Sequence, residues 1–255
     1  MEIDGLWYLG EGRVALQRAQ VGEGDVILRT LASGISRGTE RLVFQGNVPE
    51  SEHQRMALPW MEGAFAFPIK YGYANVGRVI DGPAHLVGQH AFTLNAHQTH
   101  VRAQASALTL LPPELPVIRA TLAANMETAL NAIWDSEIKP GAQVAVVGGG
   151  LVGCLTAYLA HRIGKANVTL IDVNPQRAQI ATALGLAFAQ PSDAPQEVET
   201  AFHCSATSAG LTSCIEMLGF EGQVLESEKL ASHFTSTAEL ASGHDAEDAR
   251  WGAVR

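Results

Sequence analysis

The sequence predicts an α/β protein in which an irregular all-β domain precedes a doubly wound parallel sheet. Before residue 117, short β-like runs alternate with glycine turns, which is typical of an all-β domain. After it, a short apolar run, three adjacent glycines and an apolar segment of helical length follow one another, which is typical of a βαβ unit. The proline-rich residues 110–116 separate the two patterns.

Composition restricts the class of function. The chain has 255 residues, 47% of them hydrophobic, a net charge of −9 and a pI of about 5.4. Because an acidic chain without a Lys/Arg cluster suits neither nucleic acid nor an anionic membrane, we expect neither as a partner. Three cysteines without a C-x-x-C pair favour a reduced, cytoplasmic protein. The N-terminus has no basic segment followed by an apolar run, so we expect no secretory signal.

The first domain is expected over residues 1–117. Its clearest strands are residues 26–28, 77–80 and 91–94, each bounded by glycine turns. A helix is predicted from Val117 to about Trp134, since the pattern is broken only at the Lys-Pro-Gly sequence of residues 139–141.

Residues 141–160 carry no charge and are long enough to span a bilayer as a helix. The glycines at 148–150 argue against a span, because each costs roughly 1 kcal/mol relative to alanine inside a helix and three together indicate a turn. The segment is therefore predicted to be a buried strand over residues 144–147, a glycine turn and a helix over Leu151–Ile163.

The spacing Gly148-x-Gly150-x-x-Gly153 gives each glycine a physical role. The first permits a tight turn, the second allows the backbone to approach a pyrophosphate, and the third allows close packing of helix on strand. The N-terminus of the helix then offers N–H groups to the phosphates. A second buried strand, residues 168–171, ends at Asp172. The unit is therefore predicted to bind a dinucleotide, and a nucleotide-free α/β core is the alternative.

Asp172 indicates which dinucleotide. Its carboxylate suits the hydroxyls of an adenosine ribose and repels a 2′-phosphate, so NAD is expected rather than NADP. Arg177 either flanks the adenine or weakens that preference. Backbone contact with the cofactor is expected from Cys204 and Ser205, which end a later strand. The predicted cofactor-binding residues are Gly148, Gly149, Gly150, Leu151, Val152, Gly153, Asp172, Val173, Arg177, Cys204 and Ser205.

The second domain is expected over residues 118–226. Further helices are predicted at 175–184 and 211–218, and further strands at 201–204 and 223–225. Residues 227–255 are Ser- and Ala-rich and acidic, and form a C-terminal segment of uncertain structure. A doubly wound sheet usually has more strands than these, so the C-terminal part of the fold is expected to be incomplete.

Several segments together resemble the medium-chain dehydrogenase/reductase superfamily, the zinc-type alcohol dehydrogenases and their zinc-free relatives. They are residues 31–40 (LASGISRGTE), 70–77 (KYGYANVG), the glycine pattern with the preceding Lys-Pro-Gly, and 219–225 (GFEGQVL). The resemblance covers about residues 10–226. It implies a GroES-like catalytic β-barrel joined to a Rossmann domain, and pairing into a homodimer.

Departures from the family pattern concern the metal. Ser36 occupies the place of a cysteine ligand, and Tyr73 and Ala74 replace the His-Glu of the second motif. Hydroxyls are poor zinc ligands beside thiolate and imidazole, so no zinc is expected. The sequence around Ser36, Tyr73 and residues 125–128 is most similar to that of a zinc-free branch that includes bacteriochlorophyllide dehydrogenase-like proteins. Family members also continue well beyond residue 226.

Without zinc, another group must stabilise charge on the substrate oxygen or transfer a proton. Tyr73 stands at the former ligand position, where its hydroxyl faces the nicotinamide or its ring fills the space left by the metal. His97 is either an acid–base group or a loop residue. Thr39 and Glu40 match the family's Gly-Thr-Asp element, whose hydroxyl is expected to relay a proton. Glu127 is either a buried acid with a raised pKa or a solvated helix residue.

The resemblance and the motifs together imply a zinc-independent, NAD(H)-dependent oxidoreductase. It is expected to transfer hydride between nicotinamide and a small-molecule carbonyl/alcohol or activated alkene. Aromatic and Met residues between Phe44 and Phe67 suggest a bulky, apolar substrate, although they fit a core or a lid equally well. The rival hypothesis is a non-catalytic dinucleotide-binding sensor or degenerate homologue.

Overall fold

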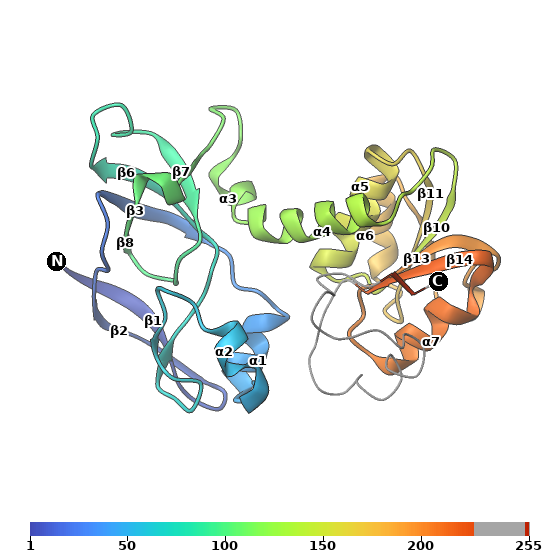
Figure 1. Ribbon diagram of the computed structural model, residues 1–255, viewed down its shortest axis with the longest axis horizontal. Coiled ribbons are helices and arrows are strands. Elements are labelled where there is room, and N and C mark those ends of the chain that lie inside the picture. Colours follow the sequence, from blue (N-terminus) through green and yellow to red (C-terminus); the bar gives the residue numbers. More distant parts are fainter. Residues whose placement is uncertain (227–252, 255) are drawn as a thin grey trace. The chain divides into compact units, whose positions relative to one another are not determined.

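The computed structural model describes residues 1–226 and 253–254 (Figure 1). The chain divides into two compact units, Met1–Ala124 and Asn125–Arg255. Apart from Ala253 and Val254, the predicted C-terminal segment lies outside the described residues. Within the described ranges, no helix is both long and apolar enough to cross a membrane.

The first unit consists of antiparallel strands in two sheets, with short helices in the connections (Figure 1). One sheet has the order β2-β1-β5-β4 and the other β8-β3-β6-β7-β9. The strands are β1 Glu2–Gly10, β2 Arg13–Gln20, β3 Val26–Ser33, β4 Glu62–Gly63, β5 Ile69–Lys70, β6 Asn75–Asp81, β7 His90–Thr93, β8 His100–Ala103 and β9 Thr109–Leu110. The helices are α1 Thr39–Gln45, α2 His53–Met56 and α3 Val117–Ala120, with 3₁₀ turns at Glu50–Glu52 and Ala105–Ala107.

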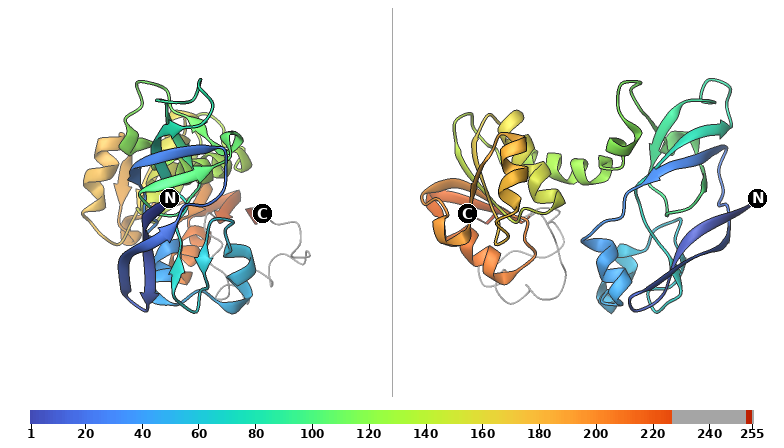
Figure 2. Two further views of the ribbon diagram at one scale, coloured as in Figure 1. Left: turned by 90° about the vertical axis from the view of Figure 1, so that its left-hand side faces the viewer. Right: turned by 180° about the vertical axis from the view of Figure 1, so that it is seen from behind.

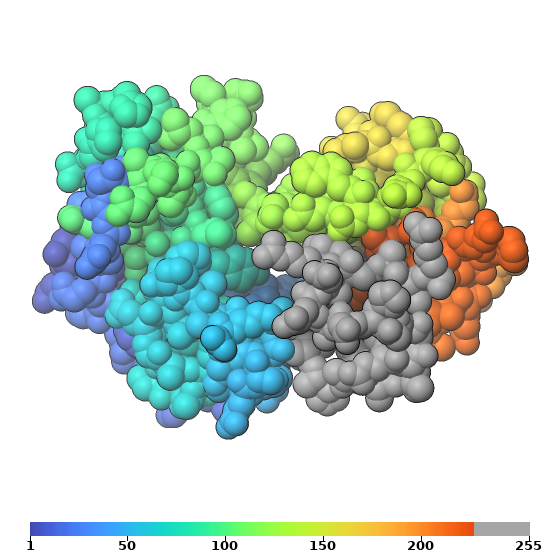
Figure 3. Space-filling view, viewed as in Figure 1, coloured from blue at the N-terminus to red at the C-terminus, as the bar shows by residue number. Residues whose placement is uncertain are grey.

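The segment between β7 and β8 hydrogen-bonds to both sheets. Between β7 and β8, the chain pairs with β1 through an isolated bridge of Gln98 with Gly5 and through a hydrogen bond from Leu6 N to His97 O of 2.8 Å. Thr99 O accepts from Thr30 N of β3 at 3.0 Å. In the space-filling view, the atoms of the first unit (blue to green) form one continuous mass (Figure 3). The segment that carries His97 is therefore fixed from both sheets.

The second unit is the predicted doubly wound sheet. Its six strands have the order β12-β11-β10-β13-β14-β15, parallel except for β15. The strands are β10 Gln143–Val147, β11 Asn167–Ile171, β12 Ala187–Ala189, β13 Val198–His203, β14 Leu218–Glu226 and β15 Ala253–Val254. The helices are α4 Ala123–Asp135, which begins at the end of the first unit, α5 Leu151–Arg162, α6 Arg177–Leu184 and α7 Ser208–Glu216, with a 3₁₀ turn at Pro191–Asp193.

Alternation along the buried strands sorts the core into two layers. Val144 and Val146 of β10 face one apolar cluster with α4, α5 and α6, whereas Ala145 and Val147 face another with Cys214 of α7. Helices thus cover both faces of the sheet (Figure 2). The parallel sheet with helices on both faces confirms the predicted fold class, and the uncharged segment at residues 141–160 is β10, a turn and α5 rather than a membrane span.

Three predictions of local structure were wrong or incomplete. The helix over Val117–Trp134 is broken into α3 and α4, and Thr121 at the break turns its hydroxyl onto Ile118 O at 2.7 Å. The hairpin of β1 and β2 was not predicted. Neither was β12, whose three residues pair with the edge of β11 and are too short for a periodic signal.

Candidate active site

The glycine turn of the second unit lies between β10 and α5, at the carboxyl edge of the parallel sheet. Ligands of open α/β sheets bind at this edge, where the strand order reverses on either side of the first strand. Gly148 N donates to Ile171 O at 2.8 Å, and Cys204 N donates to Val147 O at 2.8 Å. Adjacent strand ends therefore hold the turn on both sides.

Each glycine of the motif occupies a different steric environment. Gly148 has φ +109°, and a Cβ there would lie 2.6 Å from the carbonyl carbon of Cys204. A Cβ on Gly153 would lie 1.9 Å from Gly148 O, so this position requires glycine for the helix to pack on the turn. A Cβ on Gly150 would meet no atom within 4 Å. The first and third glycines serve the fold, whereas Gly150 leaves open space at the N-terminus of α5.

Asp172 binds the turn itself. Its Oδ2 accepts from Gly149 N at 2.6 Å and its Oδ1 accepts from Asn174 N at 2.7 Å. Arg177 begins α6, and its Cγ would lie 3.1 Å from a Cβ on Gly149. The half-buried carboxylate and this side chain therefore border the turn together.

The other predicted cofactor residues surround the same edge. Leu151 and Val152 form the first turn of α5, and Leu151 is 41% exposed. Val173 is exposed beyond β11. Cys204 is buried in the core, and its backbone, together with Ser205 N, lies against Gly148. The structure thus brings the predicted set together, with Ser205 half-buried at its border.

A histidine network that the sequence reasoning missed lies at the same edge. His203, the last residue of β13, is completely buried. Its Nδ1 lies 2.8 Å from both carboxylate oxygens of Glu226, and its Nε2 lies 2.9 Å from Ser205 Oγ and 3.1 Å from Thr207 O. The sequence signal that could have identified His203 is a polar residue at the end of an apolar strand.

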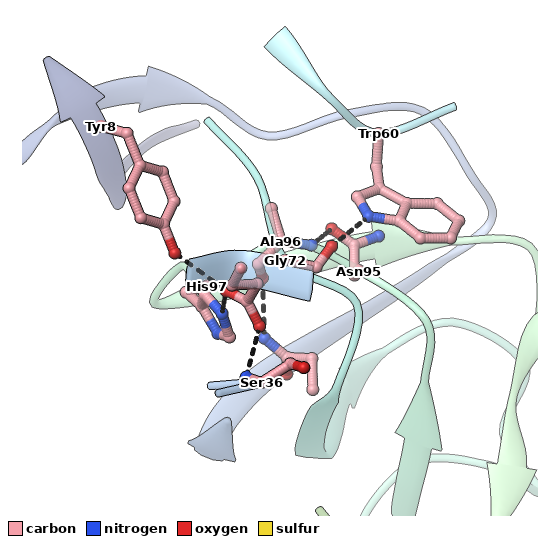
Figure 4. A network of polar contacts seen from close by, with 9 residues as sticks. Tyr8, Ser36, Trp60, Gly72, Asn95, Ala96 and His97 are labelled. Carbon is pink, nitrogen blue, oxygen red and sulfur yellow. Dashed lines mark hydrogen bonds and ion pairs between the residues drawn. The ribbon is translucent and has the colours of Figure 1, made fainter. Parts of the chain in front are cut away.

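The first unit contains a second buried network, centred on Glu40 of α1. Glu40 Oε1 accepts from Ser36 N at 2.8 Å, and Oε2 accepts from Tyr8 OH at 2.9 Å. His97 Nε2 lies 2.6 Å from Oε2. Figure 4 shows Tyr8, Ser36 and His97 converging from three segments of the chain. Glu40 is 1% exposed and His97 5% exposed, so water screens neither.

This network defines the hydrogen positions on His97. Glu40 already accepts from two donors, as an ionised carboxylate does, so the hydrogen of the contact belongs to His97 Nε2. His97 Nδ1 is buried and has no hydrogen-bond partner among the described residues. Gly72 makes room for the ring, because a Cβ there would lie 2.7 Å from His97 Nε2.

Two tyrosines beside this network are kept neutral. Burial first, and then the Glu40 charge and hydrogen bond, raise the pKa of Tyr8 well above its ordinary value. Burial is also the main cause that raises the pKa of Tyr71, whose hydroxyl donates to Met56 O at 2.9 Å. Neither phenol is poised to lose its proton near neutral pH.

The remaining catalytic candidates are Tyr73, Thr39 and Glu127. Tyr73 is partly buried, and its ring packs with the apolar clusters around Tyr71 and Phe92, as the space-filling alternative expects. Thr39 is the first, half-buried residue of α1. Glu127 is exposed on α4 and accepts from Asn131 at 3.1 Å, as the solvated alternative expects. The sequence indicated Thr39 as a catalytic candidate, whereas the buried carboxylate in the structure belongs to its neighbour Glu40.

Comparison with known proteins agrees with the fold. A family model described as the C-terminal domain of alanine dehydrogenase/PNT matches residues 120–233. The geraniol dehydrogenase of Castellaniella defragrans is 29% identical over 157 residues, which are 60% of this chain and 42% of that enzyme.

Two solved structures share the fold. A Sinorhizobium meliloti dehydrogenase described as zinc-binding, solved with NADP, has a TM-score of 0.72 at 19% identity and covers 89% of this chain and 77% of its own. An Escherichia coli alcohol dehydrogenase in complex with NADH has a TM-score of 0.72 at 11% identity, covering 88% and 75%.

The curated relatives are longer than the matched region. The chain spans 42% of the geraniol dehydrogenase and 59% of the L-threonine 3-dehydrogenase of Streptomyces avermitilis. In sequence and in fold, the chain is similar to zinc-type alcohol dehydrogenase-like proteins of the medium-chain dehydrogenase/reductase superfamily.

Proposed function

We propose that this protein is a zinc-independent, NAD(H)-dependent oxidoreductase. It transfers hydride between C4 of nicotinamide and a carbonyl/alcohol or activated-alkene substrate. The observation that carries the proposal is the glycine turn between β10 and α5, whose open position Gly150 leaves bare backbone at a helix N-terminus. That environment suits a diphosphate, because the first N–H groups of a helix have no partner within the helix.

The cofactor preference rests on Asp172. Its carboxylate borders the turn and accepts from two backbone N–H groups. An ionised carboxylate there repels a 2′-phosphate and accepts from ribose hydroxyls, so NAD is preferred over NADP. Relatives of this fold have been solved with either cofactor, so the chain's own residues decide the preference.

The donor chemistry of the first unit does not suit zinc. Where a thiolate is needed, Ser36 supplies a hydroxyl, and its backbone N–H is used by Glu40. Tyr73 replaces the imidazole and packs against apolar neighbours. In residues 1–226, no three His, Cys, Asp or Glu side chains come together as a metal site would need. The proton chemistry is therefore assigned to side chains.

His97 is the proposed acid–base group. Glu40 holds its Nε2–H at 2.6 Å, which directs the lone pair of the neutral ring to Nδ1. A bound nicotinamide would accept the hydride in alcohol oxidation. The side-chain role assigned to His97 is to take the O–H proton on Nδ1, which would leave a carbonyl product and an imidazolium. The Glu40 charge stabilises that imidazolium, as a carboxylate does in hydrolytic triads. In reduction the same proton returns to the substrate oxygen or carbon.

The apolar residues between Phe44 and Phe67 bear on the size of the substrate. Phe44, Met56, Met61 and Phe67 pack, partly buried, around the core that contains Tyr71. They therefore act as core residues and give no support to a bulky, apolar substrate, so the substrate is proposed only as a small molecule. We propose no nucleic-acid or membrane partner, a cytoplasmic location, and a homodimer as in the family.

Cofactor titration tests this function. Intrinsic fluorescence of NADH and NADPH is followed on addition of the protein, with metal content measured on the same sample. NADH is expected to bind more tightly than NADPH. Stoichiometric zinc would overturn zinc independence, and tighter NADPH would overturn the role of Asp172. Turnover is then assayed with aldehydes, quinones and enones; binding without turnover would favour the sensor.

The variant Gly150→Ala tests whether the open space is the cofactor site. Its methyl group meets no protein atom, so the melting temperature is expected to stay unchanged. NADH affinity is expected to fall about tenfold or more, because the methyl occupies space where backbone and diphosphate approach each other. Unchanged affinity would place the cofactor elsewhere.

A further inference from the structure

The buried pair His203–Glu226 ends two neighbouring strands of the parallel sheet. The two residues are directly opposite each other in the register of β13 and β14, so their side chains share one face. His203 is fully buried, whereas the side chain of Glu226 is 31% exposed. Such a pair is costly to bury unless its hydrogen bonds are satisfied.

Both ring nitrogens of His203 face acceptors. Nδ1 faces the carboxylate of Glu226, and Nε2 faces the carbonyl of Thr207 at 3.1 Å. A carbonyl only accepts, so Nε2 carries a hydrogen. The ring and the carboxyl group of Glu226 then share one further proton between Nδ1 and oxygen. In either arrangement, Nε2 has no lone pair to offer.

This fixes the hydrogen of Ser205. Because Nε2 is a donor whose one hydrogen is shared between Thr207 O and Ser205 Oγ, Ser205 Oγ accepts from it at 2.9 Å, and its own O–H points elsewhere. Thr207 Oγ1 lies 3.1 Å from Ser205 Oγ and accepts from Gly210 N, so its own O–H is able to donate to Ser205 Oγ. Ser205 is half-buried. Among the groups of this network, its O–H is therefore the one that a bound ligand is able to reach.

The backbone of the same segment is held in an uncommon conformation. Ala206 has a φ of 53°, a backbone angle that residues other than glycine rarely adopt. Thr207 caps α7, and a Cβ on Gly210 would lie 1.9 Å from Ser205 Oγ. Ser205 N lies against Gly148 of the glycine turn. The segment is thus one wall of the proposed dinucleotide site.

We propose that the His203–Glu226 pair is a positioning device that makes the Ser205 hydroxyl a hydrogen-bond donor to the bound nicotinamide dinucleotide. Ser205 contacts the cofactor, and His203 and Glu226 act through it. This inference rests on the proposed cofactor binding. It adds His203 and Glu226 to the residues that act on the cofactor and gives the Ser205 side chain the role of recognising an acceptor group.

A double-mutant cycle on the full chain tests it, with NADH titrated by fluorescence. Ser205→Ala is expected to weaken NADH binding about three- to tenfold, as the loss of one hydrogen bond does. Glu226→Gln, which removes the charge and keeps the shape, is expected to weaken it several-fold. In the Ser205→Ala background, Glu226→Gln is expected to have no further effect, because the interaction it supports is already gone.

Glu221→Gln is the matched control, because Glu221 is an exposed carboxylate of the same strand. It is expected to bind NADH like the wild type. Equal losses from Glu226→Gln in both backgrounds would overturn the proposal, since they indicate a general structural role. If Glu226→Gln fails to fold, Ser205→Ala alone decides, and unchanged affinity overturns it. A wild type that binds neither NADH nor NADPH would instead overturn the proposed function itself.

Discussion

In the described part of each unit a buried histidine lies beside a glutamate, and the two pairs differ in what they leave unsatisfied. His97 gives Nε2–H to Glu40 and has no hydrogen-bond partner on Nδ1 within the described chain. His203 meets acceptors at both nitrogens. The same residue pair therefore suits proton transfer in the first unit and positioning in the second, because only a nitrogen with a free lone pair can take a proton.

The largest difference is expected in turnover. His97→Gln removes the proposed acid–base group, so kcat is expected to fall about 10²- to 10⁴-fold while NADH affinity stays unchanged. His203→Gln is expected to weaken NADH binding instead. Steady-state kinetics and NADH titration of both variants separate the two roles. Full activity in His97→Gln would remove the contrast between the pairs.

Stability is expected to differ next. Glu40→Ala leaves Tyr8 OH, Ser36 N and His97 without their acceptor in a buried site, so unfolding free energy is expected to fall by about 3–5 kcal/mol. Glu226→Ala is expected to cost roughly 1 kcal/mol, since its carboxylate is partly exposed and screened. Urea denaturation followed by circular dichroism measures both, with the exposed Glu50→Ala as control. Equal losses of unfolding free energy would mean that Glu226 contributes as much to stability as Glu40.

Two glycines, Gly72 beside His97 and Gly210 beside Ser205, sharpen the comparison further. Gly72 has φ +125°, and a Cβ there would press on the His97 ring, so Gly72→Ala is expected to cost about 1–3 kcal/mol. Gly210→Ala displaces the Ser205 hydroxyl, whose side chain is able to rotate, and alanine favours the helix by up to about 1 kcal/mol. NADH affinity is therefore expected to fall in Gly210→Ala with the melting temperature retained. A cooperative loss of structure in Gly210→Ala would contradict this.

The smallest effect concerns alkaline pH. Because the folded-state pKa of Tyr8 is raised, the folded protein keeps a proton that the unfolded chain loses above about pH 10. Stability from this phenol is thus complete below pH 10 and is lost as the pH rises further. Tyr8→Phe is expected to flatten that decline in denaturation midpoints between pH 9 and 11. An identical decline in wild type and variant would assign it to other groups, such as Tyr71.

Local signals were enough to predict the nucleotide-binding turn. The apolar run of β10, the glycines and the helix of α5 are consecutive, so the pattern and its steric logic are contained in about 20 residues. The steric roles given to Gly148 and Gly153 agree with the structure. Prediction was weaker for the first unit, where strands are short and pair over long distances, and β1 and β2 were missed.

The sequence by itself therefore determined the fold class, the order of the two units and the position of the glycine turn, because each depends on neighbouring residues. Only the tertiary structure decided which polar groups meet. Tyr8, Glu40 and His97 come from three separate segments, and His203 meets Glu226 through the register of a parallel sheet. No local pattern specifies such contacts, since burial and partner choice arise only when the strands have been packed.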